Sequence, residues 1–105
     1  MEEIIRSGDT IELRGLGSYN IYLDEQLIGH LETQSNCKLM DIQIDSEYRG
    51  NGYGREAIEL FIEIAEEANC STISTSAVLH GAVQHVLEDN GFTMNPDTRR
   101  YKKEI

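Results

Sequence analysis

The spacing of apolar residues changes once along this chain of 105 residues, and the change separates two kinds of predicted element. In the first half, apolar and polar residues alternate over short runs, which is the spacing of half-buried strands. Strands are expected at Thr10–Arg14, Tyr19–Leu23 and Leu27–Thr33, with a hairpin loop over Asp24–Gln26. A further strand at Lys38–Asp45 completes a predicted antiparallel meander.

The last strand of this meander divides its side chains between two faces of the sheet. Strict alternation places its apolar residues on one face and its polar residues on the other. The apolar set is Met40, Ile42 and Ile44, and the polar set is Asp41, Gln43 and Asp45. The strand is therefore expected to present one face to a core and one to a polar environment.

From Tyr53 to Asn69 the apolar residues recur at every third or fourth position, which predicts an amphipathic helix packed on the sheet. The glutamates on its opposite side are expected to form its solvated face. The remaining predicted elements are a strand at Ser71–Val78, a helix at Gly81–Asn90 capped by Gly91, and strands at Phe92–Met94 and Arg99–Lys103. The order β-meander, α, β, α, β, β predicts one α+β domain over residues 1–105.

The charge balance narrows the range of partners. Nine lysines and arginines stand against 19 aspartates and glutamates, which gives a net charge of −10. This argues against a protein that binds duplex nucleic acid, because such proteins need a clustered basic face. It favours a cationic partner, such as an amine or a basic protein surface, although acidic chains are also simply soluble. No run resembles a secretory signal or is long enough to cross a membrane.

Cys37 and Cys70 belong to no CxxC pair and no Cys/His cluster. Isolated cysteines of this kind are typical of reduced thiols, and the expectation is a cytoplasmic protein with both thiols reduced. A disulfide or a metal site is the alternative, and no metal site is predicted.

Three alternating glycines, Gly50, Gly52 and Gly54, stand just before the first predicted helix. Each weakens a helix by about 1 kcal/mol relative to alanine, so their position needs a reason. A glycine-rich turn into a helix can aim successive backbone N–H groups at an anion, and the helix end adds about half a positive charge. Arg49 and Arg55 bracket the run. Tight packing or a plain turn would explain the same glycines, and the run matches neither the dinucleotide fingerprint nor a P-loop.

The run RGNGYG, Arg49 to Gly54, fits the pattern R/Q-x-x-G-x-G/A of the GNAT (Gcn5-related) N-acetyltransferases. Its surroundings also resemble that family. DEQLIGHLE is similar to the family's third strand, HGAVQHVLEDNGF to its N-x-x-A-x-x-x-Y-x-x-x-G-F helix, and TRRYKKEI to its last strand. The resemblance extends from Leu27 to Ile105, which is most of the chain.

This resemblance implies a mixed, mainly antiparallel sheet that is splayed at its centre and carries two main helices. It implies acetyl-CoA as cosubstrate, with the pantetheine arm between the strands Met40–Asp45 and Ser71–Val78 and the pyrophosphate on the amides of the glycine run. An amine would attack the thioester directly, without a covalent enzyme intermediate. The residues implied to bind the cosubstrate are Ile42, Ile44, Arg49, Gly50, Asn51, Gly52, Tyr53, Gly54, Arg55 and His80.

Several positions depart from the family pattern. Aligned through the Gly-Phe that ends the helix, the family's Asn falls on His80, and the Tyr that commonly protonates the CoA thiolate falls on Leu87. Leucine cannot donate a proton, although a thiol is a good leaving group without help. Positions of a general base in some members fall on Lys38 and Thr75, which are not obvious bases. The candidate catalytic residues are therefore Glu32, Asp41 and His80, each of which would also be an ordinary polar residue.

The segment before Tyr19 is shorter than the strand and two helices that usually form one wall of the family's acceptor pocket. The acceptor cleft is therefore either open or completed by a second subunit of a homodimer. An open acidic cleft suits a protein lysine, a chain terminus or a polyamine. The predicted function is an acetyl-CoA-dependent N-acetyltransferase. The alternatives are a catalytically impaired GNAT-like domain that binds CoA or regulates, and an unrelated α+β interaction protein.

Overall fold

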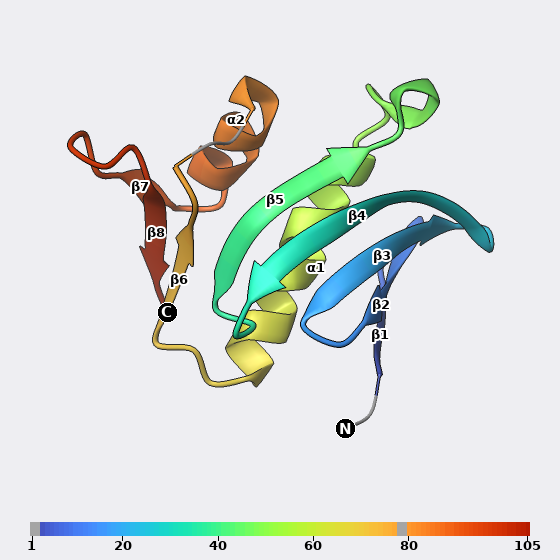
Figure 1. Cartoon of the computed structure of the whole chain (residues 1–105), viewed down its shortest axis with the longest axis horizontal. Helices are drawn as coiled ribbons and strands as arrows, with labels where there is room; N and C mark the ends of the chain where they lie inside the picture. The colour runs from blue at the N-terminus through green and yellow to red at the C-terminus, as the bar shows by residue number, and fades with distance from the viewer. Residues whose placement is uncertain (1–2, 78–79) are drawn as a thin grey trace.

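The computed structural model describes residues 3–77 and 80–105 (Figure 1). Its described strands form one eight-stranded sheet in the order β1-β2-β3-β4-β5-β6-β8-β7. The elements are β1 (Ile4–Ser7), β2 (Ile11–Gly15), β3 (Ser18–Leu23), β4 (Gln26–Gln34), β5 (Lys38–Ile44), the 3₁₀ turn η1 (Ser46–Tyr48), α1 (Tyr53–Glu67), β6 (Thr72–Thr75), α2 (Gly81–Asp89), β7 (Thr93–Met94) and β8 (Tyr101–Glu104).

The predicted order of elements is confirmed, with one addition at the start of the chain. β1 was not predicted, because its sequence IIRS is short and places two isoleucines side by side, so it shows no clear alternation. The strand predicted at Ser71–Val78 is shorter than expected and is observed at Thr72–Thr75. Val78 lies outside the described residues.

The sheet is mixed and mainly antiparallel, as predicted. β1 to β5 form the antiparallel meander, and β8 pairs antiparallel with both β6 and β7. β5 and β6 run parallel, and their ladder pairs Lys38 with Ser74 and Leu39 with Thr75. Beyond these pairs the two strands diverge, so the sheet is splayed at its centre (Figure 1).

A β-bulge explains where the splay begins. Glu32 of β4 lies opposite Asp41, but the next residue, Thr33, lies opposite Leu39, so Met40 is an extra residue in β5. A bulge bends its strand and increases its twist. This one falls directly after Leu39, where pairing with β6 ends. It also breaks the alternation predicted for β5, whose buried residues, Leu39 and Ile42, are three positions apart.

One face of the sheet carries the core, and α1 covers it (Figure 1). The apolar side of α1 is buried, and the described residues place no helix over the opposite face of the meander (Figure 1). None of the helices in the described ranges is long and apolar enough to cross a membrane. The fold thus leaves one sheet face uncovered beside the point where β5 and β6 separate.

The glutamates of α1 are mostly exposed, as predicted, but Glu56 has a structural role. Its Oε2 accepts hydrogen bonds from the backbone N–H groups of Thr10, at 2.9 Å, and Ile11, at 2.7 Å. Glu56 thereby ties the turn between β1 and β2 to the first turn of α1. Farther along the helix, Arg6 of β1 pairs with Glu63 and Glu67.

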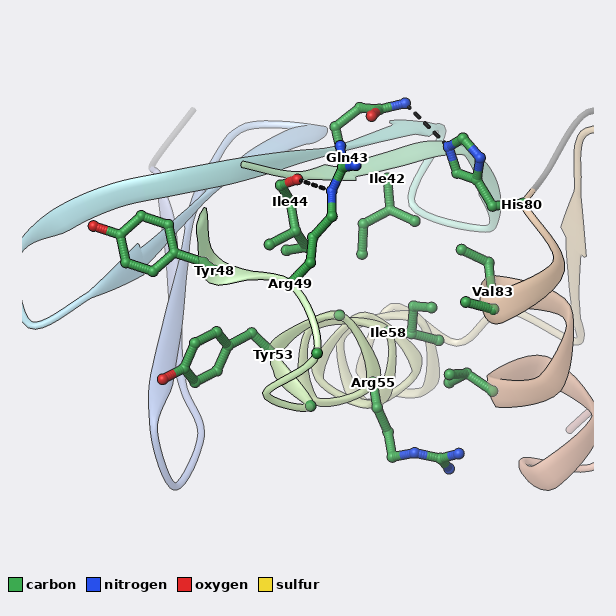
Figure 2. Close-up of a pocket in the computed structure, with 15 residues that line it drawn as sticks. Ile42, Gln43, Ile44, Tyr48, Arg49, Tyr53, Arg55, Ile58, His80 and Val83 are labelled. Carbon is green, nitrogen blue, oxygen red and sulfur yellow. Dashed lines mark hydrogen bonds between the residues drawn. The ribbon is translucent and has the colours of Figure 1, made fainter. Parts of the chain in front are cut away.

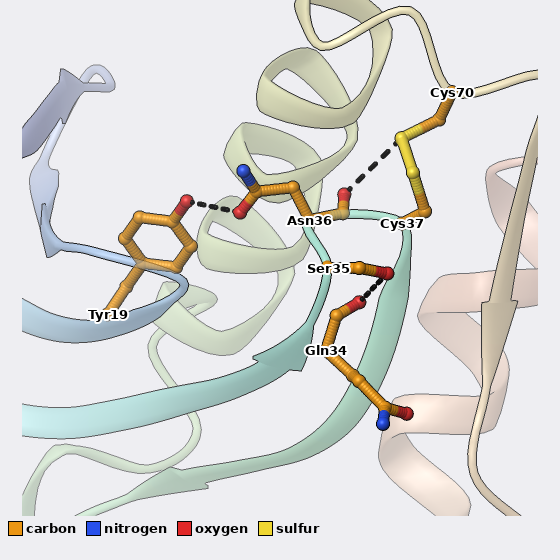
Figure 3. Close-up of a disulfide and its surroundings, with 6 residues drawn as sticks. All are labelled: Tyr19, Gln34, Ser35, Asn36, Cys37 and Cys70. Atoms are coloured by element: carbon orange, nitrogen blue, oxygen red, sulfur yellow. Dashed lines mark hydrogen bonds between the residues drawn. A yellow bond between two sulfur atoms is a disulfide. The ribbon is translucent and has the colours of Figure 1, made fainter. Parts of the chain in front are cut away.

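The two cysteines form a disulfide, so the prediction of reduced thiols is wrong (Figure 3). Cys37 lies in the turn before β5, and Cys70 lies between α1 and β6, with their Cα atoms 5.8 Å apart. The sequence spacing gave no sign of this pairing, because the crossover through α1 brings the two residues together. The disulfide joins β5 and β6 at the closed end of the splay. The cysteines therefore no longer support the predicted cytoplasmic location, since disulfides persist mainly in oxidising compartments.

Candidate functional site

A cleft of about 510 Å³ lies between β5, the start of α1 and α2, where β5 has left β6 (Figure 2). Of the residues predicted to bind the cosubstrate, all except Asn51 line it. Apolar side chains of Ile42, Ile58 and Val83 face one another across its middle (Figure 2). The glycine run forms one end of the cleft, and His80 lies at the other. The cleft therefore combines an apolar channel with a polar turn at one end.

The glycine turn has a backbone conformation that requires glycine at two positions. Gly50 has a φ of +82° and Gly52 a φ of +84°, which side chains rarely tolerate. A Cβ on either residue would meet no atom within 4 Å, so the requirement comes from the backbone and not from crowding. Gly54 belongs to the helix, and its Cβ would lie 3.8 Å from Ile44. The glycines thus shape the turn and leave its surface bare.

The same turn presents backbone donors to the cleft. Gly52 is the N-cap of α1 and provides no side-chain cap, so side chains do not satisfy the first N–H groups of the helix there. Unpaired N–H groups at a helix N-terminus, beside a turn with positive φ, form a concavity suited to an anion. This geometry is consistent with the prediction that the glycine run begins a helix whose first backbone N–H groups are exposed.

Two side chains hold the turn in place. Asn51 Nδ2 donates hydrogen bonds to the carbonyl oxygens of Tyr48, at 3.1 Å, and Arg49, at 3.3 Å. Arg49 Nε donates to the carbonyl oxygen of Ile44 at 2.8 Å and so fastens the turn to the end of β5. That bond uses one of the five donors of the guanidinium group. The side chain of Asn51 therefore supports the turn and does not line the cleft.

Arg55 connects the start of α1 to the end of α2. Its Nη2 lies 2.6 Å from Asp89 Oδ2, and the two side chains are 43% and 59% exposed. An ion pair this exposed contributes about 0 to 1 kcal/mol, so an incoming anion can replace Asp89 at little cost.

The three candidate catalytic residues fall in two places. Glu32 and Asp41 lie opposite each other on β4 and β5, on the face away from α1, and neither lines the cleft. His80 does line it, just before α2, and its Nε2 lies 3.4 Å from Gln43 Nε2. The other ionisable side chains in the cleft lining include Tyr48 and Tyr53, whose rings lie at the end of the cleft opposite His80 (Figure 2).

Two of the positions onto which the resemblance placed catalytic groups, Leu87 and Thr75, are completely buried. Leu87 is completely buried in the core and does not line the cleft. Thr75 is completely buried, and its hydroxyl donates to the carbonyl oxygen of Ser76 and accepts the N–H of Tyr101. Both residues stabilise the packing of the C-terminal elements.

Sequence reasoning missed Gln43. It placed this residue on the polar side of β5 but gave it no role, because nothing in the local sequence shows that His80, 37 positions later, lies beside it. The available signal was weak: a polar residue between Ile42 and Ile44, on the strand expected to border the cosubstrate.

Comparison with known proteins identifies the class to which this fold and cleft belong. The family model described as acetyltransferase (GNAT) family matches residues 3–92. The chain therefore belongs to the GNAT acetyltransferase family. A comparison with curated proteins gives no match.

Solved structures of acetyltransferases share the fold. The NatC complex bound to Gag peptide and CoA aligns with 84% of this chain and 70% of its own, at 16% identity and a TM-score of 0.65. RimL, the ribosomal L7/L12 alpha-N-protein acetyltransferase in its apo form, aligns with 100% of this chain and 96% of its own, at 14% identity and a TM-score of 0.75. The PaiA N-acetyltransferase from Thermoplasma acidophilum, in complex with coenzyme A, aligns with 84% of this chain and 60% of its own, at 16% identity and a TM-score of 0.61.

Proposed function

We propose that this protein is an N-acetyltransferase that transfers the acetyl group of acetyl-CoA to a primary amine. The observation that carries the proposal is the position of the glycine turn at one end of an apolar cleft in the splayed sheet. An anion-binding turn and an apolar channel together suit a cosubstrate with a diphosphate at one end and a long, flexible arm at the other.

In this proposal the diphosphate is bound by the backbone N–H groups from Gly50 to Arg55, since that of Arg49 already donates to the carbonyl oxygen of Ser46. Arg55 exchanges Asp89 for a phosphate oxygen. The pantetheine arm lies along β5 at Ile42 and Ile44, on the side away from β4, where no strand pairs with β5 because its ladder with β6 ends at Leu39. Binding through backbone N–H groups suits a protein with a net charge of −10, which would otherwise repel the diphosphate.

The proposed reaction is direct. The amine nitrogen attacks the thioester carbon, the carbon–sulfur bond breaks, and one proton passes from nitrogen to sulfur, which gives an amide and free CoA thiol. Among the three candidates, His80 is the one that lines the cleft, so it is the group placed to carry this proton. A neutral imidazole accepts the proton from nitrogen and returns it to the thiolate.

The acceptor is proposed to approach from the uncovered face of the sheet. Glu32 and Asp41 face each other there beside the cleft. Arg14, on the same sheet, already forms ion pairs with Glu12 and Glu25. Its hydrogen bond to Glu12 is the main cause of the lowered pKa of the Glu12 carboxyl. The face is therefore acidic, which suits a protein lysine, a chain terminus or a polyamine.

The acidic pair provides the test of the proposed function. In Glu32→Gln, the KM for a cationic acceptor should rise about threefold, since one attractive charge is lost, while kcat stays nearly unchanged; Asp41 is left in place because it accepts a hydrogen bond from Gln43 in the cleft lining. The measurement is acetyl-CoA consumption over a panel of lysine peptides, free peptide N-termini, polyamines and neutral amines. Glu66→Gln, on the exposed side of α1, is the matched control and should leave the KM unchanged.

The outcomes of this panel separate the alternatives. Turnover with small neutral amines alone would contradict a cationic acceptor. Binding of acetyl-CoA without turnover of any amine would indicate a CoA-binding or regulatory domain. Absence of acetyl-CoA binding would refute the proposed cosubstrate itself.

A separate prediction concerns the support of the glycine turn. Asn51→Ala removes the hydrogen bonds to the carbonyl oxygens of Tyr48 and Arg49 but leaves the backbone N–H groups in place. We expect acetyl-CoA to bind about five- to tenfold more weakly in calorimetry, since roughly 1 kcal/mol of preorganisation is lost. Asn20→Ala, exposed on β3, is the control. Equal affinity in both variants would show that the turn keeps its shape without Asn51.

A further inference from the structure

A row of polar and basic side chains crosses the uncovered sheet face at the closed end of the splay. Lys38 of β5 pairs with Ser74 of β6, and Ser74 pairs in turn with Lys102 of β8. Ser74 points to the uncovered face, because Ile73 and Thr75 on either side of it are completely buried. Residues paired directly across neighbouring strands share a face, so the two lysines flank Ser74 there. We call Lys38, Ser74 and Lys102 the basic row.

The lysines of the basic row are available to a partner. Other basic side chains, such as Arg14 and Arg55, form ion pairs. Among the described residues Lys38 has no carboxylate at ion-pair distance, and Lys102 has only Glu104, at 3.8 Å. The side chains of Lys102 and Glu104 are 62% and 77% exposed, so their attraction is weak. In a chain with a net charge of −10, such lysines side by side need a reason.

A purely structural role for the basic row is poorly supported. Lysines often protect the exposed edge of a sheet from unwanted pairing, but β5, β6 and β8 are all interior strands. Two like charges on either side of one strand repel each other, and an anion bound between them would remove this cost. The Ser74 hydroxyl lies between the lysines and can donate a hydrogen bond to the same anion. The row therefore has the composition of a site for a carboxylate group.

The basic row lies near the acidic pair on the proposed acceptor side of the cleft. Asp41 follows Lys38 by three positions on β5, which is about 10 Å of extended strand, and Glu32 faces Asp41 from β4. The uncovered face thus changes from negative to positive charge over this distance. An extended peptide advances by the same length in about three residues. One peptide can therefore contact both charges at once.

We propose that the acceptor is a protein segment with an acidic residue about three positions from the residue that carries the amine, and that the basic row binds its carboxylate. This inference rests on the proposed function, because it specifies the acceptor of the same transfer. The acidic pair attracts the amine, and the basic row attracts the carboxylate, so the two contacts fix the direction and register of the segment. A polyamine carries no anion and would gain nothing from the row.

The kinetic test compares two peptides that differ only by Glu or Gln at the third position after the residue with the amine. The wild type should have a KM about fivefold lower for the Glu peptide, as expected for two exposed ion pairs. This preference should disappear in the double variant Lys38→Gln and Lys102→Gln. Lys103→Gln is the matched control, because Lys103 pairs with the buried Ile73 and so belongs to the opposite face. It should keep the preference.

A binding measurement tests the basic row without turnover. Fluorescence anisotropy of the two peptides, labelled at the C-terminus, gives their affinities for the protein alone. The wild type should bind the Glu peptide about fivefold more tightly than the Gln peptide. Lys102→Glu should lose this preference, whereas Lys103→Glu, which has the same net charge, should keep it.

The two measurements fail separately. The proposal would be overturned by equal KM or equal affinity for both peptides in the wild type, by a preference that survives the loss of Lys38 and Lys102, or by an equal effect at Lys103. Absence of turnover with every peptide would refute the proposed function. The anisotropy measurement would still decide for or against the basic row in that case.

Discussion

Gly52→Glu is expected to reduce acetyl-CoA binding at least 100-fold, which removes it from the range of calorimetry. Two costs add at this position. To bind, the turn must hold a φ of +84° at this residue, and a variant turn that relaxes in the unbound protein must be forced back to that shape, at a cost of about 1 to 2 kcal/mol. Its carboxylate would also stand where the proposed diphosphate contacts the backbone, and would repel it. Together the two costs exceed about 2.7 kcal/mol of binding free energy, which is equivalent to a 100-fold loss of affinity.

The chain offers a matched control for this variant. Gly17, in the turn between β2 and β3, has a φ of +81° and, like Gly52, no atom within 4 Å of a Cβ. Gly17→Glu therefore adds the same strain and charge outside the cleft. It should lose similar stability in thermal unfolding and bind acetyl-CoA like the wild type. If both variants bind normally, or both lose binding together, the glycine turn is not the diphosphate site.

Removal of the disulfide is expected to have the largest effect on stability. Cys37 and Cys70 are 33 positions apart, and a crosslink that closes a loop of this length stabilises a protein by about 3 to 4 kcal/mol in the chain-entropy description. In the double variant Cys37→Ala and Cys70→Ala, the free energy of unfolding measured in urea should be lower by this amount. The midpoint of thermal unfolding should fall by at least about 10 °C, given the size of the domain.

A reductant provides the control for this prediction. It should destabilise the wild type to about the level of the double variant and leave the double variant unchanged. Equal stability of the wild type with and without reductant would show that the crosslink is absent or contributes nothing. Acetyl-CoA binding should persist in the double variant at a temperature where it is folded, because neither cysteine lines the cleft.

The sequence predicted what depends on neighbouring residues. The periodicity of α1, the alternation of β3 and β4, and the glycines at Gly50 and Gly52 are local patterns whose physical meaning does not depend on the rest of the chain. The resemblance to the GNAT family then supplied the splay, which no local pattern contains.

What the sequence did not predict depends on residues brought together from far apart. The disulfide and the contact between Gln43 and His80 both need the crossovers after β5. The bulge at Met40 depends on how β4 pairs with β5 and not on the composition of either strand. For the same reason sequence reasoning could not rank the candidate catalytic residues, because only the three-dimensional arrangement separates His80 in the cleft from Glu32 on the open face.

The position of the disulfide has a mechanical consequence. It ties β5 to β6 at the vertex of the splay, next to their two ladder pairs. Ile44 is five positions beyond Leu39 and so lies roughly 17 Å from the vertex along an extended strand. A rotation of about 10° at the vertex moves that end of β5 by roughly 3 Å at this strand length, close to the width of an atom. A small rotation at the vertex would therefore widen the far end of the cleft by a useful amount while the disulfide at the vertex hardly moved.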